Sequence, residues 1–77
     1  MRALITGGGG FLGNAVAEAL VARGDSAIGF DTHFAPSGLP ESDRYIRLTG
    51  DITDMAALAQ VVRTHRPEAV IHCAAIV

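Results

Sequence analysis

Four consecutive glycines stand near the start of the chain, where their spacing could bind an anion. The run Thr6–Gly13 reads Thr-Gly-Gly-Gly-Gly-Phe-Leu-Gly, after an apolar segment at 3–5 and before an apolar stretch at 12–20. A strand that turns on glycines into a helix points free backbone N–H groups, and the positive end of the helix dipole, at one place. A diphosphate fits there, so the spacing predicts an anion-binding turn.

The glycines of this run have separate predicted roles. Gly7 or Gly8 makes the tight turn. Gly10 lets the backbone approach a pyrophosphate, and Gly13 lets the helix pack closely on the strand. Asp31 stands at the end of the next apolar segment, where an acidic residue can bind ribose hydroxyl groups. This context, rather than the glycines alone, indicates a dinucleotide site.

Hydrophobic periodicity predicts the elements that must position these residues. We expect strands at 2–6, 26–30, 45–48 and 69–73, and helices at 11–23 and 55–65. The apolar stripes expected to be buried are Leu12, Ala15, Val16, Ala19 and Leu20 in the first helix, and Met55, Leu58, Ala59 and Val62 in the second.

The expected helix ends carry recognisable signals. Gly24 is expected to follow the first helix with a positive φ. Thr53 or Asp54 is expected to cap the start of the second helix, and Pro67 to end it. Residues 32–44 contain prolines and a glycine and lack periodicity, so they form a long loop. Two interpretations stay open for this loop, a mobile cover over a ligand and a plain surface connection.

The order strand–helix–strand–strand–helix–strand implies an open parallel sheet, and therefore an α/β fold. The segment 69–73 is continuously apolar, which is expected for a central strand covered on both faces. In a doubly wound sheet this strand lies beside the first and needs a further strand on its other side. We therefore expect residues 1–77 to be one domain that is incomplete at its C-terminal end.

Composition excludes several classes of protein. The 77 residues are 49% hydrophobic with a net charge of -2, and the 6 basic residues are scattered arginines, so a nucleic-acid partner is not expected. The single cysteine allows no internal disulfide or multi-cysteine metal site, which favours a cytoplasmic location. We expect no signal peptide, and no apolar run approaches the roughly 18 residues that span a membrane.

The glycine motif resembles the Thr-Gly-x-x-Gly-x-x-Gly motif of the extended short-chain dehydrogenase/reductase family, which includes NAD-dependent epimerases and dehydratases. Three further matches follow in order: Asp31, the segment Gly50-Asp51-Ile52, and the segment Val70-Ile71-His72-Cys73-Ala74-Ala75. The resemblance covers essentially the whole chain. It implies the N-terminal half of a Rossmann-type doubly wound parallel sheet, with about four strands and two helices, that binds NAD.

The resemblance also implies roles for individual residues. The amides of Phe11 and Leu12 face the pyrophosphate, although plain core packing of these side chains is the alternative. Asp31 accepts hydrogen bonds from the ribose, which favours NAD over NADP. The implied cofactor-binding residues are Gly7, Gly10, Phe11, Leu12, Gly13, Asp31, Asp51, Ile52, Ala74 and Ala75.

Several of these residues also have plainer interpretations. Asp51 could instead cap the second helix, Asp31 could face solvent in a turn, and the alanines are common in this chain. His72 is more readily interpreted as a packed or hydrogen-bonded residue than as a metal ligand. Cys73 is expected to be a small buried hydrophobe, and we expect no metal site.

The family's acid/base pair, Tyr-x-x-x-Lys, does not occur in these 77 residues, because the sequence contains no lysine. We therefore assign no catalytic residue. The expected function is the NAD-binding portion of an epimerase or dehydratase that transfers hydride, on a nucleotide sugar or related carbohydrate, as a homodimer if a C-terminal part exists. The alternative is a non-catalytic dinucleotide-binding or sensing protein of the same fold.

Overall fold

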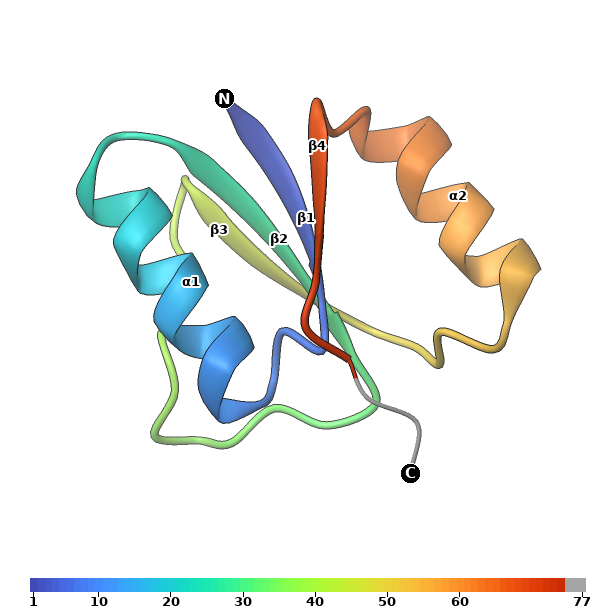
Figure 1. The fold of residues 1–77 in the computed structure, drawn as a ribbon, viewed down its shortest axis with the longest axis horizontal. Helices are drawn as coiled ribbons and strands as arrows, with labels where there is room; N and C mark the ends of the chain where they lie inside the picture. Colours follow the sequence, from blue (N-terminus) through green and yellow to red (C-terminus); the bar gives the residue numbers. More distant parts are fainter. Residues whose placement is uncertain (75–77) are drawn as a thin grey trace.

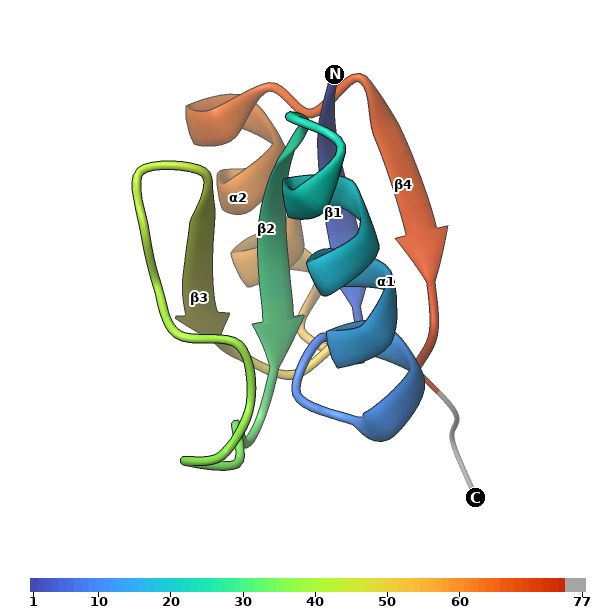
Figure 2. The ribbon, with the colours of Figure 1, turned by 90° about the vertical axis from the view of Figure 1, so that its left-hand side faces the viewer.

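The computed structural model describes residues 1–74 and contains a four-stranded parallel sheet with one helix on each face (Figure 1). The elements are β1 (Arg2–Thr6), α1 (Phe11–Ala22), β2 (Ser26–Asp31), β3 (Tyr45–Thr49), α2 (Met55–His65) and β4 (Ala69–His72). The strand order is β3-β2-β1-β4, and Figure 2 shows α1 and α2 on opposite sides of the sheet. The predicted α/β Rossmann-type fold is confirmed, and every predicted element ends within one residue of its observed end.

Strand β1 lies inside the sheet and is buried on both faces. Ala3 and Ile5 pack on the side of α1, whereas Leu4 packs on the side of α2. Successive side chains of a strand point to opposite faces, so a strand covered on both faces is apolar at every position. This is why residues 3–5 form an unbroken apolar run just before the glycines.

The prediction that the fourth strand is covered on both faces is wrong for the part of the chain that the structure describes. Strand β4 pairs with β1 and lies at the edge of the sheet. Ala69 and Ile71 pack on the α1 side, but Val70 points to the other face and is 59% exposed. Helix α2 lies over the opposite half of that face, because it packs against side chains of β2 and β3.

The predicted buried stripe of α1 is wrong at Leu12, Ala15 and Ala19, which are exposed, whereas Leu20 is buried and Val16 is half-buried against the core cluster. The buried residues of α1 are Gly13, Ala17 and Leu20, and Leu12 is 60% exposed. The helix is apolar around most of its circumference, so periodicity does not select one face. The small residue Gly13 decides the orientation, since it is the position at which the helix touches the glycine turn.

Helix α2 is rotated in the same way relative to its predicted stripe. Val61 is buried and Leu58 is half-buried, as part of the cluster under the helix, whereas Met55 is 70% exposed and Val62 is 42% exposed. Only Leu58 of the predicted stripe faces the sheet.

The helix-end predictions are confirmed. Gly24 has φ +91, and its N–H donates to the carbonyl of Val21 at 3.0 Å. Asp54 caps α2, because its carboxylate accepts the N–H of Ala57 at 3.1 Å. Helix α2 stops one residue before Arg66, which has φ +48 and directly precedes Pro67.

Residues 32–44 form the return connection between β2 and β3. Two parallel neighbours require a crossover that spans the length of a strand, which explains why this loop is long (Figure 2). The loop is fastened at Leu39, whose N–H donates to Asn14 Oδ1 at 2.7 Å and whose carbonyl accepts from Arg47 Nη2. These contacts favour the interpretation of a fixed surface connection over that of a mobile cover.

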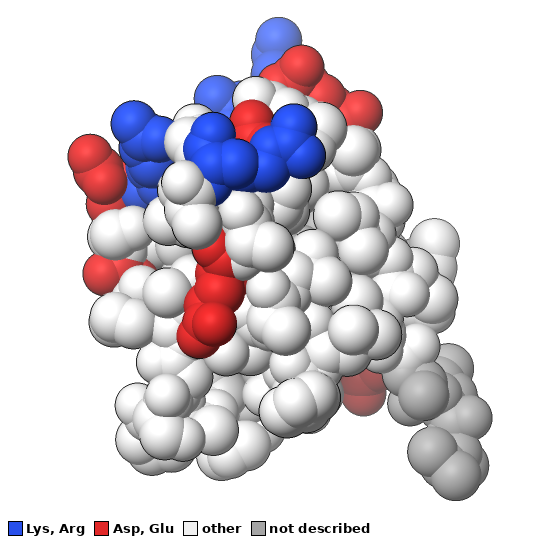
Figure 3. Space-filling model, turned by 60° about the vertical axis from the view of Figure 1, so that its left-hand side comes forward, with Lys and Arg blue, Asp and Glu red and all other residues white. Residues whose placement is uncertain are grey.

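Charged side chains of both signs gather at the end of the molecule that carries the N-terminus, while the end with the glycine turn shows few of them (Figure 3). Asp25 pairs there with the N-terminal ammonium at 3.0 Å and with Arg23 at 2.8 Å. Among the described residues, no helix is both long and apolar enough to cross a membrane.

Candidate functional site

The turn between β1 and α1 is held in shape by β2. The N–H groups of Gly7 and Gly8 both donate to the carbonyl of Phe30, at 2.9 and 3.2 Å, and the N–H of Gly10 donates to Gly7 at 3.1 Å. Gly7 has φ +70, so it is the residue that makes the tight turn. Hydrogen bonds within the protein therefore fix the turn before any ligand arrives.

The first turn of α1 carries three unused donors. Within residues 1–74, the backbone N–H groups of Phe11, Leu12 and Gly13 have no acceptor, and the first helical bond is that of Asn14 to Gly10 at 2.9 Å. The cap residue Gly10 offers no side chain, and the first turn holds no acidic residue. Unpaired N–H groups at a helix start attract an anion.

The side chains at this helix start do not enter the core. Phe11 is 95% exposed and Leu12 is 60% exposed, so core packing, the alternative interpretation of these two residues, is wrong. Their contribution to the site comes from their amides.

Gly10 and Gly13 differ in what surrounds them. A Cβ added to Gly13 would lie 2.2 Å from the carbonyl oxygen of Gly7, so this position requires glycine for close packing of α1 on the turn. A Cβ added to Gly10 would meet only the Gly7 oxygen, at 3.4 Å. The protein itself therefore leaves room at Gly10, as expected if something else occupies that space.

Asp31 ends β2 with its carboxylate held in place by backbone donors. Its Oδ2 accepts the N–H of Gly9 at 2.9 Å, and its Oδ1 accepts the N–H of Thr32 at 2.7 Å. A carboxylate offers about four lone-pair sites, so acceptor capacity remains for a ligand. The bond from Gly9 was not predicted, because the two residues lie 22 positions apart and no local pattern joins them.

A hollow of about 280 Å³ lies where the carboxyl ends of the strands meet. In open α/β sheets ligands bind outside these strand ends. Five of the predicted cofactor-binding residues line it: Gly7, Asp31, Asp51, Ile52 and Ala74. Three residues that were not predicted to bind the cofactor line it as well: Thr32, Gly50 and Thr53. The remaining predicted residues that the structure describes, Gly10, Phe11, Leu12 and Gly13, form the adjoining helix start. Ala75 lies outside the described residues.

Asp51 forms a turn rather than a helix cap. Its Oδ1 accepts the N–H and the hydroxyl of Thr53, at 2.9 and 2.8 Å, and these bonds lower the pKa of Asp51 below its ordinary value of 3.8. Asp54 is the cap of α2, so the capping interpretation of Asp51 is wrong. The spacing Asp-x-Thr is the signal that could have placed Thr53 here, because short side chains bond to the backbone two residues on.

The exit from β4 touches the glycine turn. A Cβ added to Gly7 would lie 2.6 Å from the amide nitrogen of Ala74, and the N–H of Cys73 donates to the carbonyl of Thr6 at 2.9 Å. His72 Nδ1 lies 2.6 Å from Thr6 Oγ1, so the expected hydrogen-bonded histidine is found, although its side chain is exposed. Cys73 is half-buried against the α1-side cluster.

No group of three metal-ligating side chains comes together in residues 1–74. The chemical capacity of the site is therefore that of its donors and acceptors: three amides for an anion, one fixed carboxylate for hydroxyl groups, and a hollow with an apolar wall at Ile52.

Comparison with known proteins gives a consistent picture. Residues 3–77 match the model of the NAD dependent epimerase/dehydratase family. The chain is 34% identical to dTDP-glucose 4,6-dehydratase 1 of Escherichia coli, over 97% of this chain and 23% of that protein. It is also 34% identical to UDP-glucose 4-epimerase of Mycolicibacterium smegmatis, over 97% of this chain and 25% of the relative.

Among solved structures, the chain resembles the Bordetella bronchiseptica enzyme WbmG in complex with NAD. The TM-score is 0.88 at 31% identity, over 100% of this chain and 26% of that one. The chain thus spans about a quarter of the length of the proteins it matches.

Proposed function

The chain belongs to the NAD-dependent epimerase/dehydratase family, and on that premise we propose that it binds NAD as the cofactor-holding part of a nucleotide-sugar epimerase or dehydratase. One observation carries this proposal. Three unpaired amides at the start of α1 adjoin a hollow in which the Asp31 carboxylate is already fixed.

The pyrophosphate and the adenosine half of the cofactor have matching groups in the described residues. The amides of Phe11 and Leu12 would hold the pyrophosphate, with space for its close approach at Gly10. Asp31 would accept the hydroxyl groups of the adenosine ribose.

The rest of the hollow would take the adenine. Asp51 offers a hydrogen-bond acceptor and Ile52 an apolar surface, and Ala74, with Ala75 after it, would line the cofactor without filling its space. When bound, NAD supplies hydride transfer, which no amino-acid side chain can provide.

The same geometry favours NAD over NADP. The carboxylate of Asp31 repels a 2′-phosphate, and its position is fixed by Gly9 and Thr32. Residues 32–34 contain no arginine that could neutralise such a phosphate.

We propose that the acid/base chemistry does not come from these 77 residues. Tyr45 is the only tyrosine, and it is 1% exposed, in the core beneath α1. Thr49 stands four residues later, where the family has a lysine. The piece alone should therefore bind cofactor without turning over a sugar.

The second candidate is a dinucleotide-binding protein of the same fold without catalysis. The two candidates differ in one measurement. Turnover of UDP-glucose or dTDP-glucose by the full chain in the presence of NAD supports the enzyme, whereas NAD binding without turnover of nucleotide sugars supports the alternative. From the single cysteine we also propose a cytoplasmic location. From the resemblance we propose a homodimer of the full chain, whose molar mass light scattering can measure.

The test of cofactor binding is a calorimetric titration of the full chain with NAD and with NADP, for the wild type and for Asp31→Ala. We expect the variant to bind NAD about tenfold to a hundredfold more weakly, since a hydrogen bond to a charged group contributes roughly 1.5–3 kcal/mol. The preference for NAD over NADP should shrink at the same time. Asp43→Ala removes the same charge from an exposed position away from the hollow and should change neither affinity. Equal affinities in wild type and Asp31→Ala would contradict the role of Asp31.

A further inference from the structure

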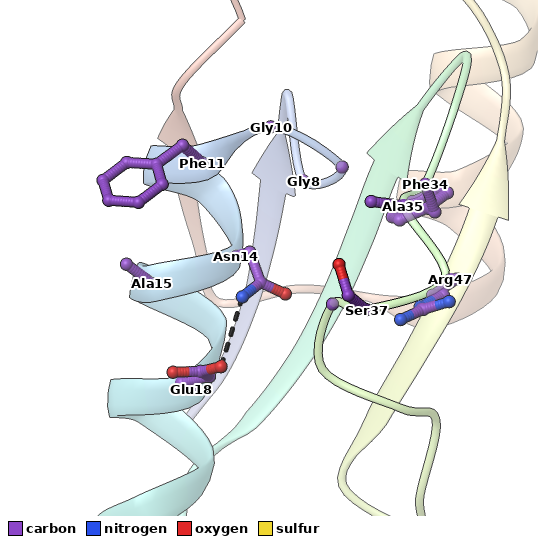
Figure 4. A pocket seen from close by; sticks show the side chains of 12 residues that line it. Gly8, Gly10, Phe11, Asn14, Ala15, Glu18, Phe34, Ala35, Ser37 and Arg47 are labelled. Atoms are coloured by element: carbon purple, nitrogen blue, oxygen red, sulfur yellow. Dashed lines mark hydrogen bonds between the residues drawn. The ribbon is translucent and has the colours of Figure 1, made fainter.

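A cavity of about 530 Å³ lies between the start of α1 and the 32–44 loop (Figure 4). One wall is the glycine turn with the first helical residue, from Gly8 to Phe11, and the other is formed by loop residues between Phe34 and Gly38. The same turn and helix start are assigned above to the pyrophosphate, so this cavity belongs to the cofactor site. The position of the loop therefore sets how much space lies beside the pyrophosphate.

Two hydrogen bonds tie this loop to the segment that carries the glycine turn. At the near end of the loop, the N–H of Gly9 donates to Asp31 Oδ2 at 2.9 Å. At the far end, the N–H of Leu39 donates to Asn14 Oδ1 at 2.7 Å. These bonds join residues that lie 22 and 25 positions apart in the chain. The part of the loop that lines the cavity is thus held at both ends by one short stretch of chain.

Between these two ties the loop contains a turn that is closed by its own backbone. The N–H of Gly38 donates to the carbonyl of Ala35 at 3.0 Å. Leu39 follows this turn, packs against the α1-side core cluster, and accepts a hydrogen bond from Arg47 Nη2 at its carbonyl. Because the turn is closed within itself, its distance from α1 depends on how Leu39 is held.

Asn14 uses both ends of its side-chain amide. Its Oδ1 accepts the N–H of Leu39, and its Nδ2 donates to Glu18 Oε1 at 3.2 Å, one turn further along α1. Figure 4 shows the side chain projecting from α1 toward the loop, with the bond to Glu18 drawn. An amide group has one acceptor end and one donor end, so the bond to Glu18 keeps the oxygen directed at Leu39. Asn14 also directly follows Gly13, the last of the three unpaired amides, and therefore links the anion-binding helix start to the loop.

We propose that Asn14 is a positioning residue of the cofactor site. It acts through Leu39, by holding the turn at 35–38 at a fixed distance from the start of α1. The space beside the pyrophosphate is then present before NAD arrives, so binding does not have to order the loop. This inference rests on the proposed binding of NAD, since the position of the loop matters to a ligand only if the cofactor occupies the site.

Asn14→Ala in the full chain tests this role. The variant removes the acceptor for Leu39, but alanine has the higher helix propensity, so the midpoint of urea unfolding should change little. Calorimetric titration is done at a temperature at which both proteins are folded. We expect NAD to bind about threefold to tenfold more weakly to the variant, since one hydrogen bond that orders the loop is lost.

Hydrogen exchange, followed by NMR without NAD, reports on the loop directly. The amides of Gly38 and Leu39 should exchange faster in Asn14→Ala than in the wild type. Gln60→Ala is the matched control, because Gln60 is an exposed amide side chain of α2 that bonds to Thr64 at 3.1 Å, also four residues further on. Gln60 lies outside the cavity, so this variant should bind NAD and exchange at the loop like the wild type.

The possible failures of this test can be told apart. Wild-type affinity for NAD in Asn14→Ala would overturn the positioning role and leave the proposed NAD binding intact. Faster exchange at the loop with unchanged affinity would overturn it too, because Asn14 would then serve the fold alone. A wild type that does not bind NAD would overturn the proposed function, and this inference with it.

Discussion

Replacement of Gly10 by alanine separates the binding of the cofactor from the stability of the fold. Gly10 has φ −82 and ψ 175, a conformation that alanine also adopts. All nine glycines lie in the described part of the chain, and Gly10 alone combines a negative φ with no added-Cβ contact shorter than 3.4 Å. Alanine at a helix cap destabilises the folded state by roughly 0.5–1 kcal/mol relative to glycine. Alanine also restricts the unfolded chain more than glycine does, which stabilises the folded state by roughly 0.4–1 kcal/mol. We therefore expect the free energy of unfolding to change by less than about 0.5 kcal/mol.

The effect on NAD binding should be much larger. A methyl group at position 10 occupies the space through which a phosphate reaches the amides of Phe11 and Leu12. Each hydrogen bond to a charged group contributes roughly 1.5–3 kcal/mol, so weakening both should cost about 3 kcal/mol, or about a hundredfold in Kd. Calorimetric titration with NAD measures this loss, and urea unfolding followed by circular dichroism measures stability.

Gly13→Ala is the contrasting variant. Its Cβ would lie 2.2 Å from the Gly7 oxygen and 2.8 Å from Gly8 Cα, so the backbone of α1 or of the turn must move. Overpacking of this kind costs roughly 1–3 kcal/mol, against a gain in helix propensity of about 1 kcal/mol. This variant should lose stability, whereas Gly10→Ala should lose binding. A folded Gly10→Ala protein with wild-type affinity for NAD would refute the assignment of the anion site.

Three further predictions concern the stability of the fold that positions the site. Asp54→Ala removes the cap of α2 and should lower the free energy of unfolding by about 1 kcal/mol, measured by urea denaturation. The hydrogen bond from the N-terminal ammonium lowers the pKa of Asp25 below 3.8, so its stabilisation is present above that pH and is lost as the pH falls further. Asp25→Asn should therefore show a shallower loss of stability than the wild type between about pH 4 and pH 2, and parallel curves would contradict this. Thr6→Val keeps the volume of a residue that is 3% exposed but removes its hydrogen bond to His72, which should cost roughly 0.5–1.5 kcal/mol in the same unfolding assay.

The sequence was sufficient to predict the order, type and ends of all six elements. The element boundaries depend on residue types that act locally, such as the glycine after α1, the capping residue Asp54 and the proline after α2. The residues gathered at the strand ends were also predictable, because parallel strands bring their carboxyl ends to one edge of the sheet.

The buried faces of both helices could not be predicted from periodicity. Helix α1 has apolar residues on nearly every side, and its orientation depends on the contact of Gly13 with the carbonyl of Gly7. That contact is a property of the folded turn. The bond from Gly9 to Asp31 was missed for the same reason, since it joins two segments that lie 22 positions apart in the chain.

The contact between the glycine turn and the exit from β4 bears on how the site is assembled during synthesis. Gly7 is synthesised well before Ala74, against whose backbone it packs, because both helices and all four strands except β1 lie between them in the chain. Contacts between such distant segments form late, because a long loop must first be closed. The nascent chain therefore carries the glycine motif without the strand that completes it until β4 has been synthesised. Cofactor capture should begin only once β4 has joined β1.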